Sequence, residues 1–320
     1  IDLPDNFGCS KRLRRLRSGV GRAFIFIPMA ARIEKIDIFH SIDYVGPFLF
    51  KPARYVATVH DLIPVKAPEL TTPKHRFVGR HLLPRMVRMA DKVIAVSQAT
   101  KNDLVSLFGK EAEKVKVVYE GVDPIYCPRA GAEVHKVKKK YRIESDYFLF
   151  IGNIEPRKNL ETVLEAYSRS RARGAVRFVV AGKKGWMYED FFRAVVEKGL
   201  EREVLFLGFV PDKDLPALLS GALFFAFPSL YEGFGLPVLE AMACGVPVIT
   251  SNVSSLPEVV GDAAILIDPR NVEELAWRME MLCDSMELRL ELRKKGQERA
   301  KMFSWDKAAR QTFEVYRELA

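Results

Sequence analysis

The feature that most constrains the fold of this chain is a repeated alternation of short apolar runs and helical patterns. Helix-forming stretches, such as 73–90, separate the runs. Strands that alternate with helices predict a parallel sheet with helices on both faces. Apolar runs without a polar face fit strands buried on both sides. In the first part of the chain these runs are 36–41, 55–60, 92–97 and 114–121.

The alternation is interrupted once and then resumes. Residues 127–146 are polar and rich in lysine, which predicts a linker with a short helix. The tail, 271–320, has the pattern of three helices without a strand. Two α/β domains in tandem predict a ligand site between them, at the carboxyl ends of the strands. The later apolar runs are 147–153, 176–182, 204–210, 223–229, 247–251 and 263–268.

The segment LYEGFGLPVLEAMACG, residues 230–245, combines glycines, a proline and two glutamates after one of these runs. Pro237 suits the first turn of a helix that starts after Gly235. Backbone amides at such a helix start attract phosphate. Glu240, about one turn inside, is either a helix-stabilising acid or a ligand group. A carboxylate beside a phosphate repels the ligand unless it bonds hydroxyl groups, so Glu232 indicates a polyhydroxy ligand such as a sugar.

A second segment, GNIEPRKN at 152–159, follows the first strand of the second domain. Arg157 and Lys158 are adjacent cations where a helix begins, a position that is unfavourable for positive charge. An anionic ligand would remove that conflict. A guanidinium binds phosphate through two parallel hydrogen bonds, and an ammonium acts as a point charge.

These two segments occur with further motifs on both sides. Upstream are IFHSIDY, VATVHDLIP, ADKVIAVSQATKNDL and VVYEGVD, and downstream is SSLPEVVGDAAILIDP. Together they resemble the retaining glycosyltransferases of family GT4, in the mannosyltransferase-like branch. The resemblance covers residues 36–320. It implies the α/β fold called GT-B, in which two Rossmann-like doubly wound domains face each other across a cleft.

The resemblance also implies a domain plan. Residues 1–130 would form an acceptor-side Rossmann-like domain, 131–146 a linker, and 147–300 the nucleotide-sugar-binding domain. Residues 301–320 would form a helix that packs back toward the N-terminal domain. The segment SGVGRA, 18–23, resembles the glycine-rich loop of the family but lies too close to the strand at 36–41. The first βα unit is therefore either missing or shortened.

Site roles follow residue by residue from the resemblance. Arg157 and Lys158 would bind the donor diphosphate, with Glu232 beside the donor sugar. His60 would bond that sugar from the opposing domain, and Glu240 would bond the ribose hydroxyls. The nucleobase would lie near 208–211. The remaining expected donor contacts are Gly152, Val210, Gly233, Phe234, Gly235 and Leu236.

The implied activity is that of a retaining hexosyltransferase. The donor would be GDP-mannose first and a UDP-sugar next, and the acceptor a glycan or a lipid-linked intermediate. A hydrolysing nucleotide-sugar 2-epimerase on the same fold is an alternative, and so is a non-catalytic nucleotide-sugar binder. We expect no cofactor and no metal. The only D-x-D, at 212–214, precedes a helical pattern, where an N-cap is the simplest interpretation.

Charge and composition bear on partners. The net charge is +9, and the densest basic run is KRLRRLR at 11–17. That run is either a solvated helix face or a peripheral contact with anionic membrane, and no motif of a nucleic-acid-binding fold accompanies it. Four scattered cysteines, with no run of ~20 apolar residues and no signal peptide, predict a cytoplasmic protein. The basic run would allow a peripheral position at the inner face of the plasma membrane.

His40 allows two interpretations. It lies at the end of a predicted strand, in the sequence IFHS. It either faces the acceptor cleft or has a local hydrogen-bond partner.

Overall fold

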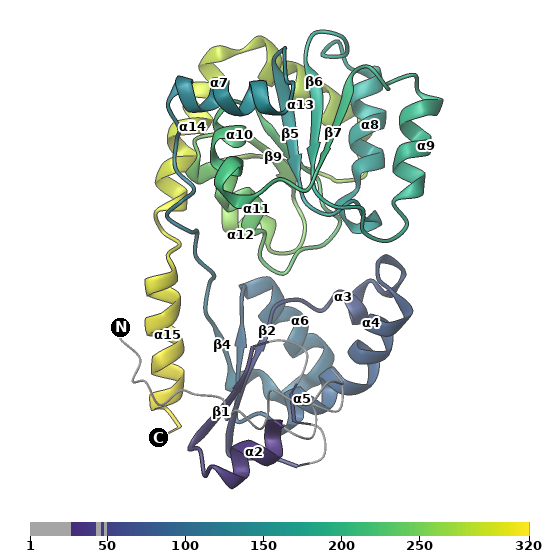
Figure 1. Ribbon diagram of the computed structural model, residues 1–320. Coiled ribbons are helices and arrows are strands. Elements are labelled where there is room, and N and C mark those ends of the chain that lie inside the picture. The colour runs from purple at the N-terminus through teal and green to yellow at the C-terminus, as the bar shows by residue number, and fades with distance from the viewer. Residues whose placement is uncertain (1–26, 43–45, 48–49, 320) are drawn as a thin grey trace. The chain divides into compact units, whose positions relative to one another are not determined.

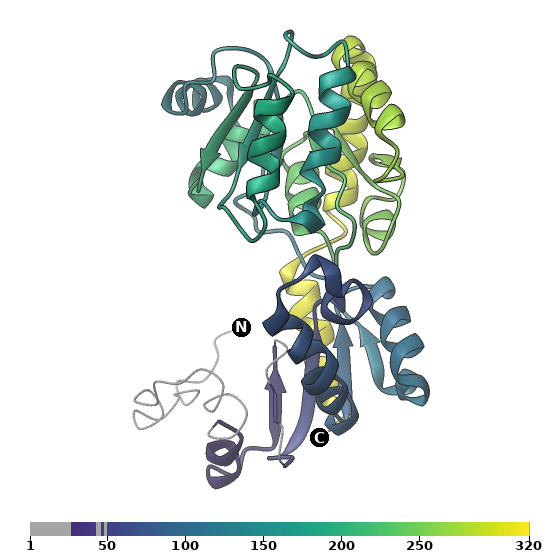
Figure 2. The ribbon, with the colours of Figure 1, turned by 90° about the vertical axis from the view of Figure 1, so that its right-hand side faces the viewer.

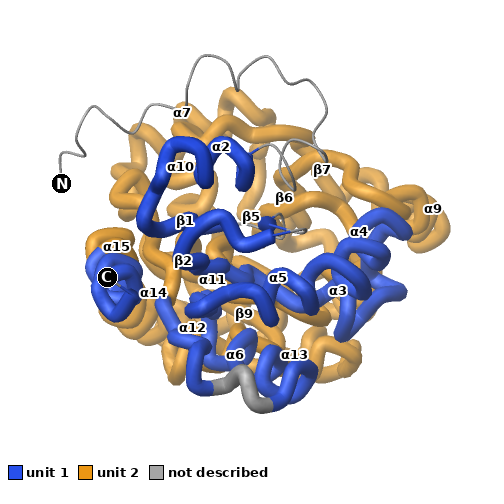
Figure 3. Tube along the Cα trace, turned by 90° about the horizontal axis from the view of Figure 1, so that it is seen from below, with its two compact units in different colours: residues 1–118, 310–320 blue, residues 119–309 orange. Residues whose placement is uncertain are grey.

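The computed structural model describes residues 27–42, 46–47 and 50–319, and the chain divides into two compact units (Figure 3). Unit 1 comprises residues 1–118 and 310–320, and unit 2 comprises residues 119–309. The basic run 11–17 and the glycine-rich segment 18–23 lie outside the described residues.

The unit boundary follows residue 118, whereas the sequence plan put the end of the first domain at 130. The physical reason is that the chain already packs on unit 2 from Tyr119 onward. The Tyr119 ring contacts the rings of Phe234 and Phe303, and Val122 forms a bridge with Ser304. The expected linker, 131–146, lies inside unit 2.

Unit 1 is built on a four-stranded parallel sheet in the order β1-β2-β3-β4. Each of the four predicted runs overlaps one of its strands, although β2 begins one residue before the run at 55–60 (Figure 1). The inner strand β2 is buried from Tyr55 to Val59, as expected for a strand covered on both faces. The strands are β1 (Ile38–Ser41), β2 (Arg54–Val59), β3 (Lys92–Ala95) and β4 (Val115–Val117).

Capping side chains begin two helices of unit 1. The Thr72 hydroxyl accepts a hydrogen bond from the His75 amide at the start of α4, and Ser97 does the same for Thr100 in α6. The predicted helix 73–90 is present as α4, a π-helical turn η4, and α5. The helical elements are α2 (Ile27–Ile33), α3 (Ile63–Lys66), η3 (Pro68–Leu70), α4 (Pro73–Phe77), η4 (Val78–Leu82), α5 (Leu83–Met89), α6 (Gln98–Phe108) and η5 (Gly109–Lys114).

Unit 2 is built on a six-stranded parallel sheet in the order β10-β9-β8-β5-β6-β7. The chain runs outward from β5 to β7, then returns to the other side of β5 with β8. The carboxyl ends of β5 and β8 therefore form a switch point, where open α/β sheets bind ligands. The strands, all predicted, are β5 (Tyr147–Ile151), β6 (Arg177–Ala181), β7 (Val204–Gly208), β8 (Phe225–Phe227), β9 (Val248–Ser251) and β10 (Ile265–Ile267).

Helices cover both faces of this sheet. Helices α8 and α9 lie together on one side, and α10, α11 and α14 on the other (Figure 1). In Figure 2, α8 and α9 face the viewer side by side. The helical elements are α7 (Gly131–Lys140), η6 (Pro156–Lys158), α8 (Leu160–Arg169), α9 (Glu189–Glu197), η7 (Asp212–Asp214), α10 (Leu215–Ser220), α11 (Leu236–Ala243), α12 (Leu256–Val260), α13 (Val272–Asp284), α14 (Met286–Ala300) and α15 (Trp305–Arg317), which continues into unit 1.

A stack of aromatic rings holds the centre of this sheet together. The ring of Phe148 on β5 lies parallel to that of Phe178 on β6, with centroids 4.5 Å apart. Its other face stacks on Phe224, just before β8, at 5.0 Å. All three side chains are fully buried. This packing fixes β5 between its two neighbours and so supports the switch point.

The tail forms the three predicted helices α13, α14 and α15. Tyr316, near the end of α15, belongs to unit 1 and contacts its sheet. Its hydroxyl lies 2.6 Å from Nδ1 of His40, and the Thr58 hydroxyl lies 2.8 Å from Nε2. His40 therefore has hydrogen-bond partners within unit 1, although both are distant from it in sequence. None of the helices in the described ranges is long and apolar enough to cross a bilayer.

The His40 environment predicts a pH dependence of the stability of unit 1. Burial, together with the nearby His60, lowers the pKa of His40 to about 4. The unfolded chain protonates near pH 6.5 and the folded chain does not, so stability is lost as pH falls from about 6.5 toward 4. Denaturant unfolding should show a loss of about 2 kcal/mol between pH 7 and pH 5.

A matched pair of variants isolates this contribution. His40→Gln should remove that part of the pH slope, and replacing the exposed His81 by Gln should keep it. Identical slopes in wild type and His40→Gln would contradict the assignment.

Candidate functional site

The loops after β5 and β8 meet at the switch point of unit 2 and carry the predicted charges. Turn η6 after β5 presents Arg157 and Lys158, and Glu232 follows β8. Asn159 ties the two loops together, because its side-chain amide donates to the carbonyl oxygens of Pro228 and Pro269, at 3.0 and 2.7 Å. The Leu230 amide also donates to the Arg157 carbonyl. Residues distant in sequence are thereby held within contact.

Four side chains, Glu155, Arg157, Lys158 and Glu232, form what we call the charged cluster. The Lys158 ammonium lies 2.7 Å from Oε1 of Glu232, and Nη1 of Arg157 lies 2.7 Å from Oε2. Arg157 also contacts Glu155 through Nη2, at 2.7 Å. The Ser229 hydroxyl donates to Glu232 at 2.6 Å. Both oxygens of Glu232 are therefore bound by cations.

The charged cluster is almost entirely removed from solvent. The Lys158 and Glu232 side chains are 8% and 9% exposed, and Lys158 also lies over the ring of Phe227. Burial lowers the pKa of Lys158, against the opposing effect of Glu232. Burial would raise the pKa of Glu232, but Lys158 and Arg157 hold it below its usual value. The Glu232 carboxylate is therefore charged and held by its partners.

This arrangement refines the sequence interpretation of Glu232. The family resemblance placed the two cations on the donor diphosphate and the acid beside the donor sugar. In the structure they are joined in ion pairs. A planar guanidinium and an ammonium at a switch point suit phosphate oxygens. A phosphate in that position would take over cation contacts that Glu232 and Glu155 now make.

Helix α11 begins beside the cluster, as predicted. Gly235 is its N-cap with φ of 110°, a conformation that favours glycine. The Ser255 hydroxyl bonds the carbonyl oxygens of Glu232 and Phe234, and Ser254 accepts from the Glu232 amide. The segment 232–235 is buried throughout. The helix start with Gly233, Phe234, Gly235 and Leu236 is thus rigidly held.

Glu240 lies in a partly buried, acidic environment on α11. Burial raises its pKa to about 7. A hydrogen bond with Tyr126 opposes this shift, and the charges of Asp212 and Asp123 add to it. A carboxyl group that changes charge near neutral pH can both donate to and accept from hydroxyl groups. Such chemistry suits a ribose edge.

The other predicted residues are spread over both units. Gly152 follows β5 and Val210, which is buried, follows β7. His60 belongs to unit 1, at the end of β2, and its Nε2 lies 2.9 Å from the Ile42 carbonyl oxygen.

The D-x-D segment does not form a side-chain cap. Asp214 occupies the N-cap position of α10, but its carboxylate does not bond the helix amides. It accepts instead from Lys140 at 2.5 Å and from the Tyr141 hydroxyl at 2.8 Å. Asp214 therefore stands at the predicted N-cap position, but its side chain does not cap the helix, because the end of α7 offers a cation and a hydroxyl close by. Among the described residues, no group of three or more His, Cys, Asp or Glu side chains is arranged to hold a metal.

Two family models match the chain. One, described as "Glycosyl transferases group 1", spans residues 133–299, more than half of the 320 residues. The other, "Glycosyltransferase Family 4", spans residues 6–125. The chain belongs to the group 1 glycosyltransferases, in family 4. It is a hexosyltransferase.

Relatives of this glycosyltransferase include named mannosyltransferases. O-antigen chain mannosyltransferase B of Escherichia coli is 37% identical over 284 residues, which cover 86% of this chain and 74% of the relative. The serotype-specific mannosyltransferase WbdA of Escherichia coli is 32% identical over 276 residues, and the match spans only 34% of its length. MMP alpha-(1->4)-mannosyltransferase of Mycolicibacterium hassiacum is 30% identical, over 90% of this chain and 72% of that protein.

Solved structures share the fold. Anabaena HepE, in complex with UDP and glucose, superposes with a TM-score of 0.77 at 21% identity, over 95% of this chain and 84% of that one. Sucrose-phosphate synthase from Thermosynechococcus elongatus gives a TM-score of 0.79 at 21% identity, over 94% and 78%. With two parallel sheets flanked by helices, this glycosyltransferase has the GT-B fold.

Several residues that build the site of the glycosyltransferase were missed in the sequence. Glu155 binds Arg157, Asn159 joins the two loops, and Ser229 donates to Glu232. Ser255 holds the start of α11. The available signal was position, because each lies within a few residues of a predicted charge or of a strand end.

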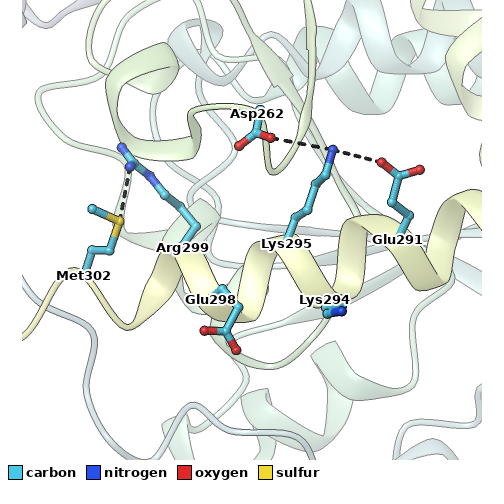
Figure 4. A pocket seen from close by; sticks show the side chains of 7 residues that line it. All are labelled: Asp262, Glu291, Lys294, Lys295, Glu298, Arg299 and Met302. Carbon is cyan, nitrogen blue, oxygen red and sulfur yellow. Dashed lines mark hydrogen bonds and ion pairs between the residues drawn. The ribbon is translucent and has the colours of Figure 1, made fainter.

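A surface pocket of about 520 Å³ lies along α14, apart from every predicted site residue (Figure 4). Lys295 forms ion pairs there with Glu291 at 2.8 Å and with Asp262 at 3.6 Å. Another lining acid, Glu298, pairs with Lys301 outside the pocket at 2.6 Å. The lining residues are Asp262, Glu291, Lys294, Lys295, Glu298, Arg299 and Met302.

Replacing Lys158 should destabilise unit 2. Lys158→Met removes one of the two cations that hold the buried Glu232 carboxylate, and such a loss costs about 3 kcal/mol. Denaturant unfolding measures the change. The added substitution Glu232→Gln should recover part of the loss, whereas Lys184→Met, at an exposed lysine, should change stability little. Equal stability of wild type and Lys158→Met would refute the ion-pair account.

Glu240 should make stability fall with rising pH. Its folded pKa of about 7 exceeds its ordinary value of 4.5. The folded state therefore binds more protons between these values, and the cost is largest above pH 7. The free energy of unfolding of Glu240→Gln, taken relative to wild type, should therefore increase by about 2 kcal/mol from pH 5 to pH 8. Glu161→Gln, at an exposed residue of α8, serves as the control, and a constant difference for Glu240→Gln would contradict the shift.

Proposed function

We propose that this glycosyltransferase transfers a mannosyl group from GDP-mannose to a glycan or lipid-linked acceptor, with retention of configuration. The names of the relatives support mannosyl transfer and a polysaccharide product. The observation that carries the proposal is the charged cluster at the switch point of unit 2, where two cations are held by carboxylates that a diphosphate can replace.

The donor diphosphate would bind Arg157, Lys158 and the amides at the start of α11. In the reaction, the bond between C1 of the sugar and the phosphate oxygen breaks. The sugar gains oxocarbenium character, and negative charge grows on the diphosphate. Fixed cations and helix-start amides stabilise that charge, which lowers the barrier. The acceptor oxygen attacks from the same face, and its proton passes to the departing phosphate oxygen.

The two glutamates would hold the donor on either side of its diphosphate. Glu232, once a phosphate replaces it at the cations, can accept hydrogen bonds from sugar hydroxyls. Glu240 would bond the ribose, and Val210 and Gly152 would contact the base and the phosphates. His60 would bond the donor sugar from unit 1. Each of these assignments follows the family resemblance.

The proposal also names the nucleotide of the donor. The solved structure of HepE contains UDP and glucose, and the relatives named above are mannosyltransferases. We therefore place GDP-mannose first and a UDP-sugar second. Catalysis would need no metal and no other cofactor, and nucleic acid would not be a partner. The protein would act in the cytoplasm, with a peripheral contact to anionic membrane.

A donor panel tests the proposal. Thermal shift with GDP, UDP and ADP should raise the melting temperature for one base, because a ligand at 100 times its Kd adds about 2.7 kcal/mol. Nucleotide release from the matching sugar donors should then depend on acceptor, and NMR of the product gives its anomeric configuration. Arg157→Ala should lower turnover by about 10²–10³. Glu165→Gln, at a surface ion pair of α8, should not.

Three results would count against parts of this assignment. No shift with any nucleotide contradicts the donor site. Release of nucleotide with an epimerised free sugar identifies the 2-epimerase instead. Binding without turnover on any acceptor points to a nucleotide-sugar binder.

A further inference from the structure

Glu155 is a buried acid of the charged cluster, only 5% exposed. Its Oε1 accepts from both Nε and Nη2 of Arg157, at 3.0 and 2.7 Å. The Nη1 end of the same guanidinium reaches Glu232 and the Tyr231 carbonyl. The guanidinium plane is therefore held at both ends. A planar fork must be oriented before it can bind two phosphate oxygens at once.

The charged groups that face Glu155 come from two loops. Arg157 and Lys158 approach from η6, and Glu232 approaches from the loop after β8. A third segment, after β6, packs against Glu155 with the backbone of Gly185. The nearby Lys184 ammonium lies instead over the ring of Tyr188, 4.9 Å from its centroid.

The charges of the cluster balance, with two carboxylates against two cations. A donor diphosphate adds two negative charges to a site that water hardly reaches. Unbalanced charge in such a place costs several kcal/mol. Proton uptake by a carboxylate removes one of those charges. The charge count therefore couples diphosphate binding to a proton.

Glu155 is the member best placed to accept that proton. Burial raises its pKa, although Arg157 and Lys158 oppose the shift. The cations hold the pKa of Glu232 below its usual value. If the diphosphate draws Arg157 toward itself, Glu155 loses its principal partner and remains buried. Among the described residues, Arg157 is the one cation that forms an ion pair with Glu155. Protonation then removes the charge of a buried carboxylate that has lost this partner.

We infer that Glu155 is a positioning residue that orients Arg157 and takes up a proton from solvent when the donor diphosphate binds; this rests on the proposed function. Binding then raises the pKa of Glu155 further. Donor affinity is greatest at low pH and falls as pH rises toward the bound-state value, by up to about tenfold per pH unit.

Isothermal titration calorimetry tests the inference with GDP-mannose and UDP-glucose. A free nucleotide is unsuitable, because a terminal phosphate itself titrates near pH ~6. Titrations are run at one pH in buffers with different ionisation enthalpies. The slope of the observed binding enthalpy against the buffer ionisation enthalpy gives the number of protons taken up. Wild type should take up more protons per donor than Glu155→Gln, and the difference should be at most one proton.

Two variants locate the proton. Glu155→Gln should bind donor with a smaller slope and a weaker dependence of affinity on pH than wild type, because a glutamine cannot take up the proton. Any proton exchange at Glu240, whose pKa is about 7, is common to both proteins. Glu165→Gln, at an ion-paired glutamate on the surface of α8, should keep the wild-type slope. Circular dichroism checks that both variants are folded.

Three outcomes overturn the inference. Equal proton uptake in wild type and Glu155→Gln would assign the proton to Lys158, Glu232 or Glu240. If Glu155→Gln does not fold, Glu240→Gln removes the other titrating carboxyl of the proposed donor site, and a flat pH dependence of its donor affinity between pH 6 and pH 8 refutes the inference. Failure of every sugar nucleotide to bind contradicts the proposed function as well.

Discussion

The cost of burying charge is the constraint on which the site of this glycosyltransferase depends. Lys158 and Glu232 are both almost inaccessible to water, and each is stable there only beside the other. Their loops must therefore stay in register. Asn159, next to Lys158, contributes to this by donating a hydrogen bond to the Pro228 carbonyl oxygen after β8. The sheet order makes this possible, because it places β8 next to β5 rather than next to β7.

A buried ion pair adds little to stability compared with a well-packed apolar pair. Its presence at a switch point is better understood as preparation for a ligand. The carboxylates keep Arg157 and Lys158 charged and oriented while they shield them from each other. Under the proposed function, the donor brings its own negative charge to replace them and offers hydroxyl groups to the acid that it displaces.

The strands could be predicted from sequence because each is a short apolar run buried on both faces, as β2 and β5 show. The start of α11 could also be predicted, because Gly235 and Pro237 specify it within a few residues of sequence. The contacts of the site were not local, since they join side chains from separate loops. Arg157 and Glu232 lie far apart in sequence, and His40 finds Tyr316 across 276 positions. Asp214 had a local role available and took a distant partner instead.

Helix α15 has a consequence for how the chain is assembled during translation. Tyr316 bonds His40, and Glu318 pairs with Lys92, so unit 1 draws on residues made after the whole of unit 2. Unit 2 is a continuous segment that can fold as soon as it emerges, whereas unit 1 is discontinuous. Unit 1 is therefore synthesised first but completed last. Its sheet lacks the contacts of residues 310–320 until the end of the chain has been made.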